Sequence, residues 1–319
     1  MLYKRGISVR HSRLTTAYDY LEKVYGQLGF NQLNSDLLKH FCLIRVLEPA
    51  SKIKSIYLLQ KYFGVEYKKT TVFRQLQQAT SLKDQVVVAA IDYARQNLDF
   101  DFSLVFYDVT TLYFETHESD DFRLNGFSKD NKINQPQILV GLMVNHTGFP
   151  VYYDLFPGNT FEGHTIIPLI LGIKAKYEIG RLTVVADAGM LSAANLAAVE
   201  ENRIDYIVGG RIKKLNLEQI RFIAHKLDQT DGKLIRQSEF IFEYSARRAK
   251  KDKSDNERQV QKAEYLISHP TKILKRSSFI TSPRNNTLSL NRETIEKYRL
   301  LEGIKGYKTN VADIPDQLC

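Results

Sequence analysis

The stretch Ser103-Leu104-Val105-Phe106-Tyr107-Asp108-Val109-Thr110-Thr111-Leu112-Tyr113-Phe114 decides the fold class of this 319-residue chain. Its β-branched and aromatic residues are typical of a β-strand. Before it, within residues 1–100, apolar residues recur three and four positions apart, as in 15–25 and 36–46, which predicts amphipathic helices. The period therefore changes at about residue 101, where a helical region gives way to a sheet.

Strands and helices follow this first strand in a regular order. Ranges 137–144 and 150–156 are predicted strands, and Thr147-Gly148 between them predicts an antiparallel hairpin. The next predicted elements are a helix, a strand, a helix with Ser192 as its N-cap and a short strand, over 165–177, 182–187, 193–201 and 206–210. This order predicts an α/β fold in which three antiparallel strands lead into parallel ones, the mixed sheet with which a ribonuclease-H-like core begins.

Four parts are predicted along the chain. Residues 1–100 form a helical domain whose short helices and tight turns suit either a helix-turn-helix that binds DNA or a dimerisation module. Residues 101–210 form the first part of the ribonuclease-H-like core. Residues 211–290, where the sequence becomes polar and charged around a strand at 239–244, form a basic insertion subdomain. Residues 291–319 return a strand to the core.

The composition is that of an ordinary globular protein with a basic surplus. Hydrophobic residues make up 43%, and 45 lysines and arginines against 36 aspartates and glutamates give a formal charge of +9. This surplus suits a polyanionic partner, because neutralised phosphates release their counterions. The two cysteines, Cys42 and Cys319, exclude a disulfide framework, and no apolar run resembles a signal peptide or a membrane span. We therefore expect a cytoplasmic protein with no membrane partner.

Two aspartates are placed where a sheet can bring them together. Asp108 lies in the first core strand, and Asp187 ends the fourth. An aspartate near a strand end is commonly a turn or capping residue, so either one alone says little. In a ribonuclease-H-like sheet, however, these two strands are neighbours, and two converging carboxylates need a cation such as Mg²⁺ to offset their repulsion. Such a pair suits metal-assisted phosphoryl transfer.

Several segments resemble, in the same order, the blocks of bacterial insertion-sequence transposases of the DDE type with a Tyr-Arg-Glu-Lys signature. Phe106-Tyr107-Asp108-Val109-Thr110-Thr111, together with 122–130, resembles the first catalytic block. Val184-Val185-Ala186-Asp187-Ala188-Gly189-Met190 resembles the second. The segment 157–165 is similar to the family's turn before the first crossover helix, and 244–252 is similar to the basic helix of its insertion domain.

The resemblance implies an enzyme that cuts and joins DNA. Asp108 and Asp187 are then two of three carboxylates that hold Mg²⁺ or Mn²⁺, and the partner is double-stranded DNA, bound by a homodimer at the nucleoid. The third carboxylate, a glutamate on a late helix, is not recognisable, because Glu302 has the wrong spacing from Tyr298 and Arg299. We interpret Glu302 as surface charge. Since 303–310 resembles the strand before that helix, we expect a truncated chain that cleaves DNA poorly.

Basic residues beyond the core strands are predicted to contact DNA. The set consists of Lys213, Lys214, Arg247, Arg248, Lys250 and Lys251, and Thr110 of the first catalytic block is assigned with it. A solvated charged surface explains the same basic residues equally well, because Asp252 and Asp255 interrupt the run. His117 and His164 are far apart and not paired with cysteine, so we expect surface or hydrogen-bonding roles for them.

Three functional hypotheses follow from these patterns. The first is a DNA transposase, and the second is a non-catalytic DNA-binding remnant that inhibits a full-length copy. The third is a phosphotransferase with Asp108 as its nucleophile. That chemistry wants a second aspartate two residues later, where this chain has Thr110, and the third hypothesis is therefore disfavoured.

Overall fold

The computed structural model describes residues 12–116, 118–127, 132, 134–190, 192–270, 277–281 and 288–312. Its contacts divide the chain into two compact units. The first combines Met1–Asp101 with Leu142–Tyr153, and the second combines Phe102–Gly141 with Asp154–Cys319. No helix in the ranges that the structure describes is long and apolar enough to cross a membrane.

Residues 15–97 of the first unit form short helices, as the sequence predicted. They are α1 (Thr15–Gln27), η1 (Phe30–Leu33), α2 (Asp36–Leu47), α3 (Lys52–Leu58), the π-helical turn η2 (Leu59–Phe63), α4 (Lys69–Ala79), η3 (Thr80–Leu82) and α5 (Lys83–Asn97). Ser51 caps α3, since its hydroxyl accepts a hydrogen bond from the Lys54 backbone N–H at 3.3 Å. Ile44, Leu58 and Leu59 are buried together and hold α2 against α3.

One eight-stranded mixed sheet organises the second unit, although residues 142–144 of β2 and 150–153 of β3 are counted with the first. Its strands are β1 (Leu104–Tyr113), β2 (Gln137–Val144), β3 (Pro150–Pro157), β4 (Thr183–Ala186), β5 (Asp205–Gly209), β6 (Leu234–Gln237), β7 (Phe240–Tyr244) and β10 (Ile304–Thr309). Their order is β3-β2-β1-β4-β5-β10-β7-β6. β1, β4 and β5 are parallel, whereas β10 is antiparallel to both β5 and β7. The predicted α/β fold with a ribonuclease-H-like mixed sheet is confirmed.

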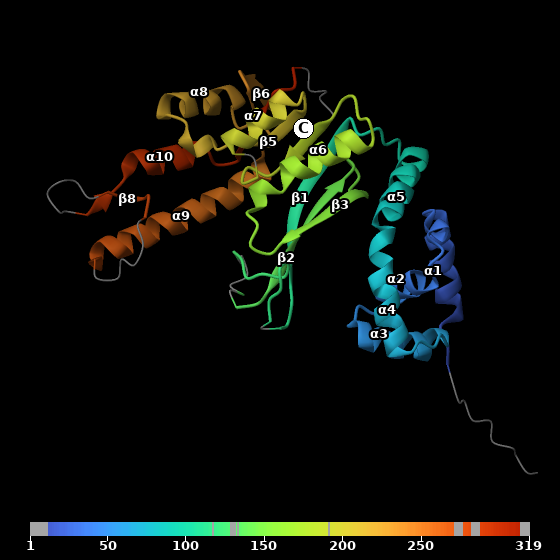
Figure 1. Cartoon of the computed structure of the whole chain (residues 1–319). Helices are drawn as coiled ribbons and strands as arrows, with labels where there is room; N and C mark the ends of the chain where they lie inside the picture. Colours follow the sequence, from blue (N-terminus) through green and yellow to red (C-terminus); the bar gives the residue numbers. More distant parts are fainter. Residues whose placement is uncertain are drawn as a thin grey trace, which may run out of the picture. The chain divides into compact units, whose positions relative to one another are not determined.

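Helices complete this unit. They are α6 (Ile166–Lys176), α7 (Ala193–Glu201), α8 (Leu217–Leu227), α9 (Ala246–Ser268) and α10 (Arg292–Leu300), with the short turns η4 (Glu162–His164) and η5 (Ile212–Lys214). α6 buries Ile166, Leu169, Ile170 and Ile173, three or four residues apart, which is why this segment is helical. Figure 1 shows α9 extending from the sheet toward α10 and the small hairpin of β8 (Ile280–Thr281) and β9 (Ser289–Leu290).

The region predicted as an insertion contributes to the same sheet. β6 and β7 come from 211–290 and extend the sheet beyond β10. Ile223 and Leu227 of α8 pack in one cluster with Phe242 of β7 and Ile304 of β10. The sequence predicted a strand at 239–244 and a helix from Ala246, but it missed β6, α8 and α10. This helix, α9, continues to Ser268, well beyond the segment 244–252 that resembled a basic helix.

The turn after β3 needs a glycine. The Gly158 N–H donates to the Phe122 carbonyl at 3.1 Å, and the buried Gln137 side chain donates to the Gly158 carbonyl at 2.8 Å. A Cβ at Gly158 would overlap the backbone carbonyl oxygens of Gln137 and Leu124. The turn and the adjacent strand therefore approach too closely for any side chain at this position.

We expect Gly158→Ala to lower the free energy of unfolding by about 1–3 kcal/mol, because backbone must move to admit the methyl group. Gly172→Ala is the matched control, since a Cβ at this position in α6 meets no atom within 4 Å. It should be neutral or stabilise by up to about 1 kcal/mol. Urea unfolding of both variants checks this, and equal stability of the two would contradict the close approach.

Candidate active site

Parallel pairing of β1 with β4 brings Asp108 and Asp187 to the same level of the sheet. The register pairs Leu104 with Thr183, Val105 with Val184 and Phe106 with Val185. When this register is extended by two residues, Asp108 of β1 lies opposite Asp187, the residue that follows β4. Neighbouring strands lie about 4.8 Å apart, so the two aspartates are adjacent.

Alternation along β1 decides which way these carboxylates face. Val105, Tyr107 and Val109 are at most 6% exposed and form the buried side of the strand. Phe106, Asp108, Thr110 and Leu112 alternate with them and are all exposed. Asp187 is exposed as well. The paired carboxylates and the predicted contact residue Thr110 therefore lie on the open side of the sheet, where a substrate can reach them.

The chemistry of this pair fits a divalent cation. Neither Asp108 nor Asp187 forms an ion pair with a lysine or arginine in the described part of the chain. Asp187 Oδ1 accepts one hydrogen bond, from the Ala188 backbone N–H at 2.7 Å, and this fixes its orientation. Carboxylate oxygens without a cationic partner are the ligands that Mg²⁺ and Mn²⁺ prefer. Within the described ranges, no group of three or more His, Cys, Asp or Glu residues could hold a metal ion.

A side chain that the sequence did not single out holds the loop after β4. The Asn195 amide donates to the Met190 carbonyl at 2.9 Å and also to the Gly163 carbonyl. The Met190 N–H in turn donates to the Asp187 carbonyl at 3.0 Å. Asn195 is thus a positioning residue for the turn that carries Asp187. The available signal was its position three residues after the N-cap Ser192. This position lies in the first turn of α7, close to the loop.

A buried hydrogen-bond chain anchors the back of β1. Tyr107 Oη lies 2.7 Å from Thr165 Oγ1, which donates its own proton to the Glu162 carbonyl at 2.6 Å. Tyr107 must therefore be the donor to Thr165. Burial raises the pKa of Tyr107 to about 12, so this proton stays in place at neutral pH. The chain ties the strand that bears Asp108 to the segment before α6.

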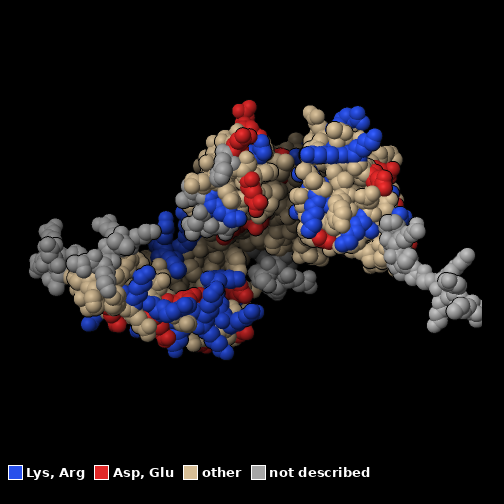
Figure 2. All heavy atoms as spheres, turned by 90° about the horizontal axis from the view of Figure 1, so that it is seen from below, with Lys and Arg blue, Asp and Glu red and all other residues tan. Residues whose placement is uncertain are grey.

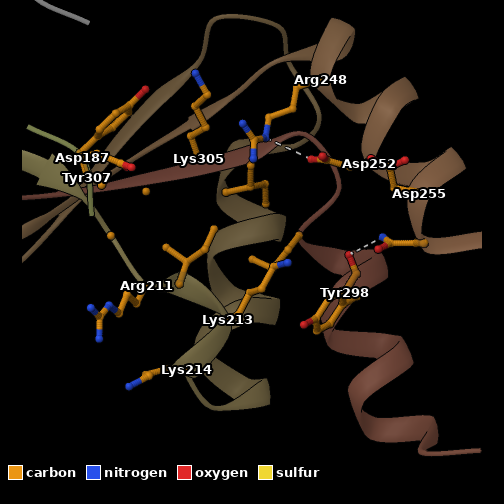
Figure 3. Close-up of a pocket in the computed structure, with 17 residues that line it drawn as sticks. Asp187, Arg211, Lys213, Lys214, Arg248, Asp252, Asp255, Tyr298, Lys305 and Tyr307 are labelled. Atoms are coloured by element: carbon orange, nitrogen blue, oxygen red, sulfur yellow. Dashed lines mark hydrogen bonds and ion pairs between the residues drawn. The ribbon is translucent and has the colours of Figure 1, made fainter. Parts of the chain in front are cut away.

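A cavity of about 680 Å³ opens beside Asp187. Figure 3 shows Asp187 and Tyr307 at one end, with Tyr298, Asp252 and Asp255 at the other. Its basic lining residues are Arg211, Lys213, Lys214, Arg248 and Lys305. Because five cations line a space that begins at Asp187, the cavity suits a phosphate-bearing chain.

The structure brings together only part of the predicted DNA-binding set. Lys213, Lys214 and Arg248 line the cavity. Arg247, Lys250 and Lys251 are exposed on α9 but do not line it. Sequence reasoning missed two lining cations, Arg211 and Lys305. Lys305 is exposed between the buried Ile304 and Gly306 of β10, so the alternation of that strand was its signal.

Specific contacts shape the cavity wall. Lys213 Nζ lies 4.3 Å from the centre of the Tyr298 ring, a cation–π contact. Arg248 Nε donates to Asp252 at 3.1 Å, which partly offsets its charge. Asn256 Nδ2 donates to the Tyr298 carbonyl at 3.1 Å and to Glu302 Oε1 at 2.9 Å.

The prediction of Glu302 as ordinary surface charge was wrong. It is half-buried and accepts the Asn256 hydrogen bond, which joins α9 to the end of α10. His164 is exposed, with its ring edge-on to Phe161 at 5.4 Å. His117, Cys319 and residues 128–130 of the first block lie outside the described residues. Cys42 is a free, exposed cysteine.

Comparison with known families decides what this arrangement is. Residues 99–300, more than half of the chain, match the family model described as the transposase DDE domain. The chain belongs to this DDE transposase family. The matched range contains both aspartates of the transposase domain and all the basic residues predicted to contact DNA.

Solved transposase structures show weak likeness to the chain. A piggyBac transposase synaptic complex with hairpin DNA is 10% identical at a TM-score of 0.28, covering 49% of this chain and 35% of that one. A Mos1 transposase paired-end complex with the left transposon end is 13% identical at a TM-score of 0.24, and a Mos1 mariner paired-end complex with Mn is 14% identical at 0.23. Both cover 65% of this chain and 61% of theirs. No curated protein matches, so the family assignment rests on the sequence match.

We expect Asn195→Ala to lower the free energy of unfolding by about 1–3 kcal/mol, because it leaves two carbonyls without their donor. Hydrogen exchange of the Ala188 and Met190 amides should become faster. Asn202→Ala is the control, since Asn202 on the same helix donates only to the exposed Ala198 carbonyl at 2.8 Å. Unchanged exchange at Ala188 and Met190 in the Asn195 variant would show that another contact holds the loop.

Proposed function

We propose that this protein is a DNA transposase of a bacterial insertion sequence, which cleaves and joins DNA strands by in-line phosphoryl transfer. The single observation that carries the proposal is the pair Asp108 and Asp187. These carboxylates are exposed, free of ion pairs within the described residues, and in register on neighbouring parallel strands of a DDE transposase domain. Their spacing and orientation suit a shared divalent ion.

The residues on this face have distinct proposed roles. Asp108 and Asp187 would hold Mg²⁺ or Mn²⁺, which when bound activates the attacking oxygen and stabilises the leaving one. The Ala188 N–H orients Asp187, and Asn195 keeps its loop in place. Thr110, two residues beyond Asp108 on the same side of β1, would contact the DNA backbone next to the cut.

The basic cavity gives the proposed path of the DNA backbone. Arg211, Lys213, Lys214 and Lys305 surround the space that starts at Asp187, so phosphates bound there would lead directly to the metal site. The Mos1 and piggyBac structures are paired-end and synaptic complexes. By analogy we propose that two copies of this protein hold two insertion-sequence ends, in the cytoplasm at the nucleoid.

A second candidate function follows from the number of acids. Two carboxylates hold a divalent ion less firmly than three, and the described residues contain no three-acid group. We propose that these 319 residues cleave DNA slowly on their own. A chain that binds DNA without cutting it would act as an inhibitor of an active transposase.

Asp108→Ala and Asp187→Ala are each expected to reduce nicking of supercoiled plasmid by about 100-fold or to background, because the charge on the reacting phosphate loses its counter-ion. The purified chain is incubated with plasmid in Mn²⁺ or Mg²⁺. Asp92→Ala, an exposed acid on α5, is the control. Nicking that survives both substitutions would overturn the proposed function, and rapid Mg²⁺-dependent nicking abolished by Asp108→Ala would overturn only the slow-activity proposal.

Lys213→Ala and Lys305→Ala are expected to weaken duplex binding and to make its salt dependence shallower. Each lost phosphate contact should change the slope of log K against log salt by about 0.9. Fluorescence anisotropy with a duplex of arbitrary sequence, at several salt concentrations without metal, measures this. Lys23→Ala, on the exposed surface of α1, should leave the slope unchanged. Equal slopes in all three variants would place the DNA elsewhere.

A further inference from the structure

We infer that four exposed apolar residues, Val46, Leu47, Ile53 and Tyr57, form a docking site for an acidic amphipathic helix of a partner protein. These four residues, named the α2–α3 corner, lie in the first unit, outside the matched transposase domain. Binding of a protein there is a further function, separate from the cutting and joining of DNA.

Apolar side chains are concentrated in the α2–α3 corner. Its four residues are between 38% and 69% exposed. All of them fall within residues 46–57, on the last turn of α2 and along α3. Single exposed apolar residues are common on protein surfaces, whereas a group of neighbouring ones marks an interaction site.

α3 carries apolar residues on two sides, and only one side serves the core. Leu58 is buried and packs with Ile44 and Leu59. Ile53 and Tyr57 are exposed and do not belong to that cluster. Because they are four positions apart, they lie one turn above each other on the helix. The core of the unit therefore does not explain this second apolar side.

Polar contacts hold the α2–α3 corner in a fixed shape. Lys54 Nζ pairs with Glu48 at 3.0 Å, which joins the start of α3 to the residue that follows α2. The Arg45 guanidinium donates to the Ala50 carbonyl at 3.1 Å, across the same connection. A partner would meet a surface that is already formed, so little ordering entropy opposes its binding.

The charge around the corner is positive. Glu48 is the only acid in residues 37–65. Arg45, Lys52 and Lys61 are exposed and form no ion pair with any residue that the structure describes. Figure 2 views the molecule from the side on which α3 lies in Figure 1, and it shows more Lys and Arg than Asp and Glu on the helical unit. A partner that covers the corner is therefore expected to be acidic.

A helix is the element that suits this surface. Ile53 and Tyr57 are about 6 Å apart along the axis of α3, at 1.5 Å per residue. Apolar residues at i and i+4 of a partner helix repeat at the same distance, so the two rows can interdigitate. Glutamates or aspartates beside such a row would reach the lysines on either side of the corner.

A second copy of the chain and duplex DNA both fit less well. A second copy would bring Arg45, Lys52 and Lys61 against the same cations, and like charges oppose association. Duplex DNA would neutralise the cations, but its charged backbone offers no apolar surface to Val46 and Ile53. An acidic amphipathic helix satisfies both the charge and the apolar side chains.

The test uses three fluorescent helical peptides, each about 16 residues long and blocked at both ends. The first has leucines at helical spacing with glutamates on both flanks. The second has lysines in place of the glutamates, and the third has the first composition in scrambled order. Fluorescence anisotropy with the full chain is expected to show the first peptide binding at least about tenfold more tightly than the other two.

Ile53→Ser and Tyr57→Ser are each expected to weaken binding of the acidic peptide by about tenfold, because each removes an apolar anchor. Phe222→Ser is the matched control, since it removes an exposed aromatic side chain from α8 in the other unit. Circular dichroism of all three variants should match the wild type, because none of these side chains is buried.

Charge reversal tests the chemistry of the partner. Lys52→Glu combined with Lys61→Glu is expected to weaken binding of the acidic peptide and to strengthen binding of the basic one. Lys23→Glu, an exposed position on α1, is the control and should change neither affinity.

Each outcome decides the inference. Selective binding of the acidic peptide that depends on Ile53 and Tyr57 supports it. The inference is overturned if the acidic peptide does not bind, or if the basic or scrambled peptide binds as well. It is also overturned if the two variants change only the sedimentation of the protein alone, which would assign the corner to a second copy, or only its binding to a duplex. Plasmid nicking that depends on Asp108 tests the proposed function separately and should be unchanged in both variants.

Discussion

The site depends on the parallel pairing of β1 with β4. Asp108 and Asp187 are distant in the sequence, and the register that pairs Val105 with Val184, extended by three residues, places them opposite each other. A shift of one residue in this register would turn one carboxylate to the opposite face of the sheet. The apolar alternation of β1, with Val105, Tyr107 and Val109 buried, opposes such a shift because it would expose them.

The two sides of β1 lie in opposite environments, one buried and one exposed. The buried side is fixed by the core and by the hydrogen bond from Tyr107 to Thr165. The opposite side keeps Phe106 at 37% and Leu112 at 49% exposure around the two aspartates. An aspartate in mid-strand on a covered face would lose its hydration without a partner, at a cost of several kcal/mol. The open face thus leaves both aspartates accessible to solvent, which the proposed metal site requires.

The basic cavity arises from the C-terminal half of the sheet. β10 inserts between β5 and β7, and this brings Lys305 and Tyr307 beside the loop that follows β5. α9 then adds Arg248 and Asp252 from the far side. The packing of α8 on Phe242 and Ile304 holds these strands in place. A late strand that returns to the sheet is therefore what brings these cations beside Asp187.

The sequence by itself determined the elements of the core and the two aspartates. Strong local patterns were sufficient there: alternation in β1, β-branched residues in β4, and the serine cap before α7, each of which depends on residues a few positions apart. Only the tertiary structure decided that β6 and β7 join the core sheet, that Arg211 and Lys305 line the cavity, that Asn195 holds the Asp187 loop, and that Glu302 is tied to Asn256. These features depend on pairing between segments far apart in the chain, and local spacing carries no information about such contacts. The basic residues and the two aspartates of this DDE transposase domain are therefore visible in the sequence. Their positions in space follow from the order of the strands.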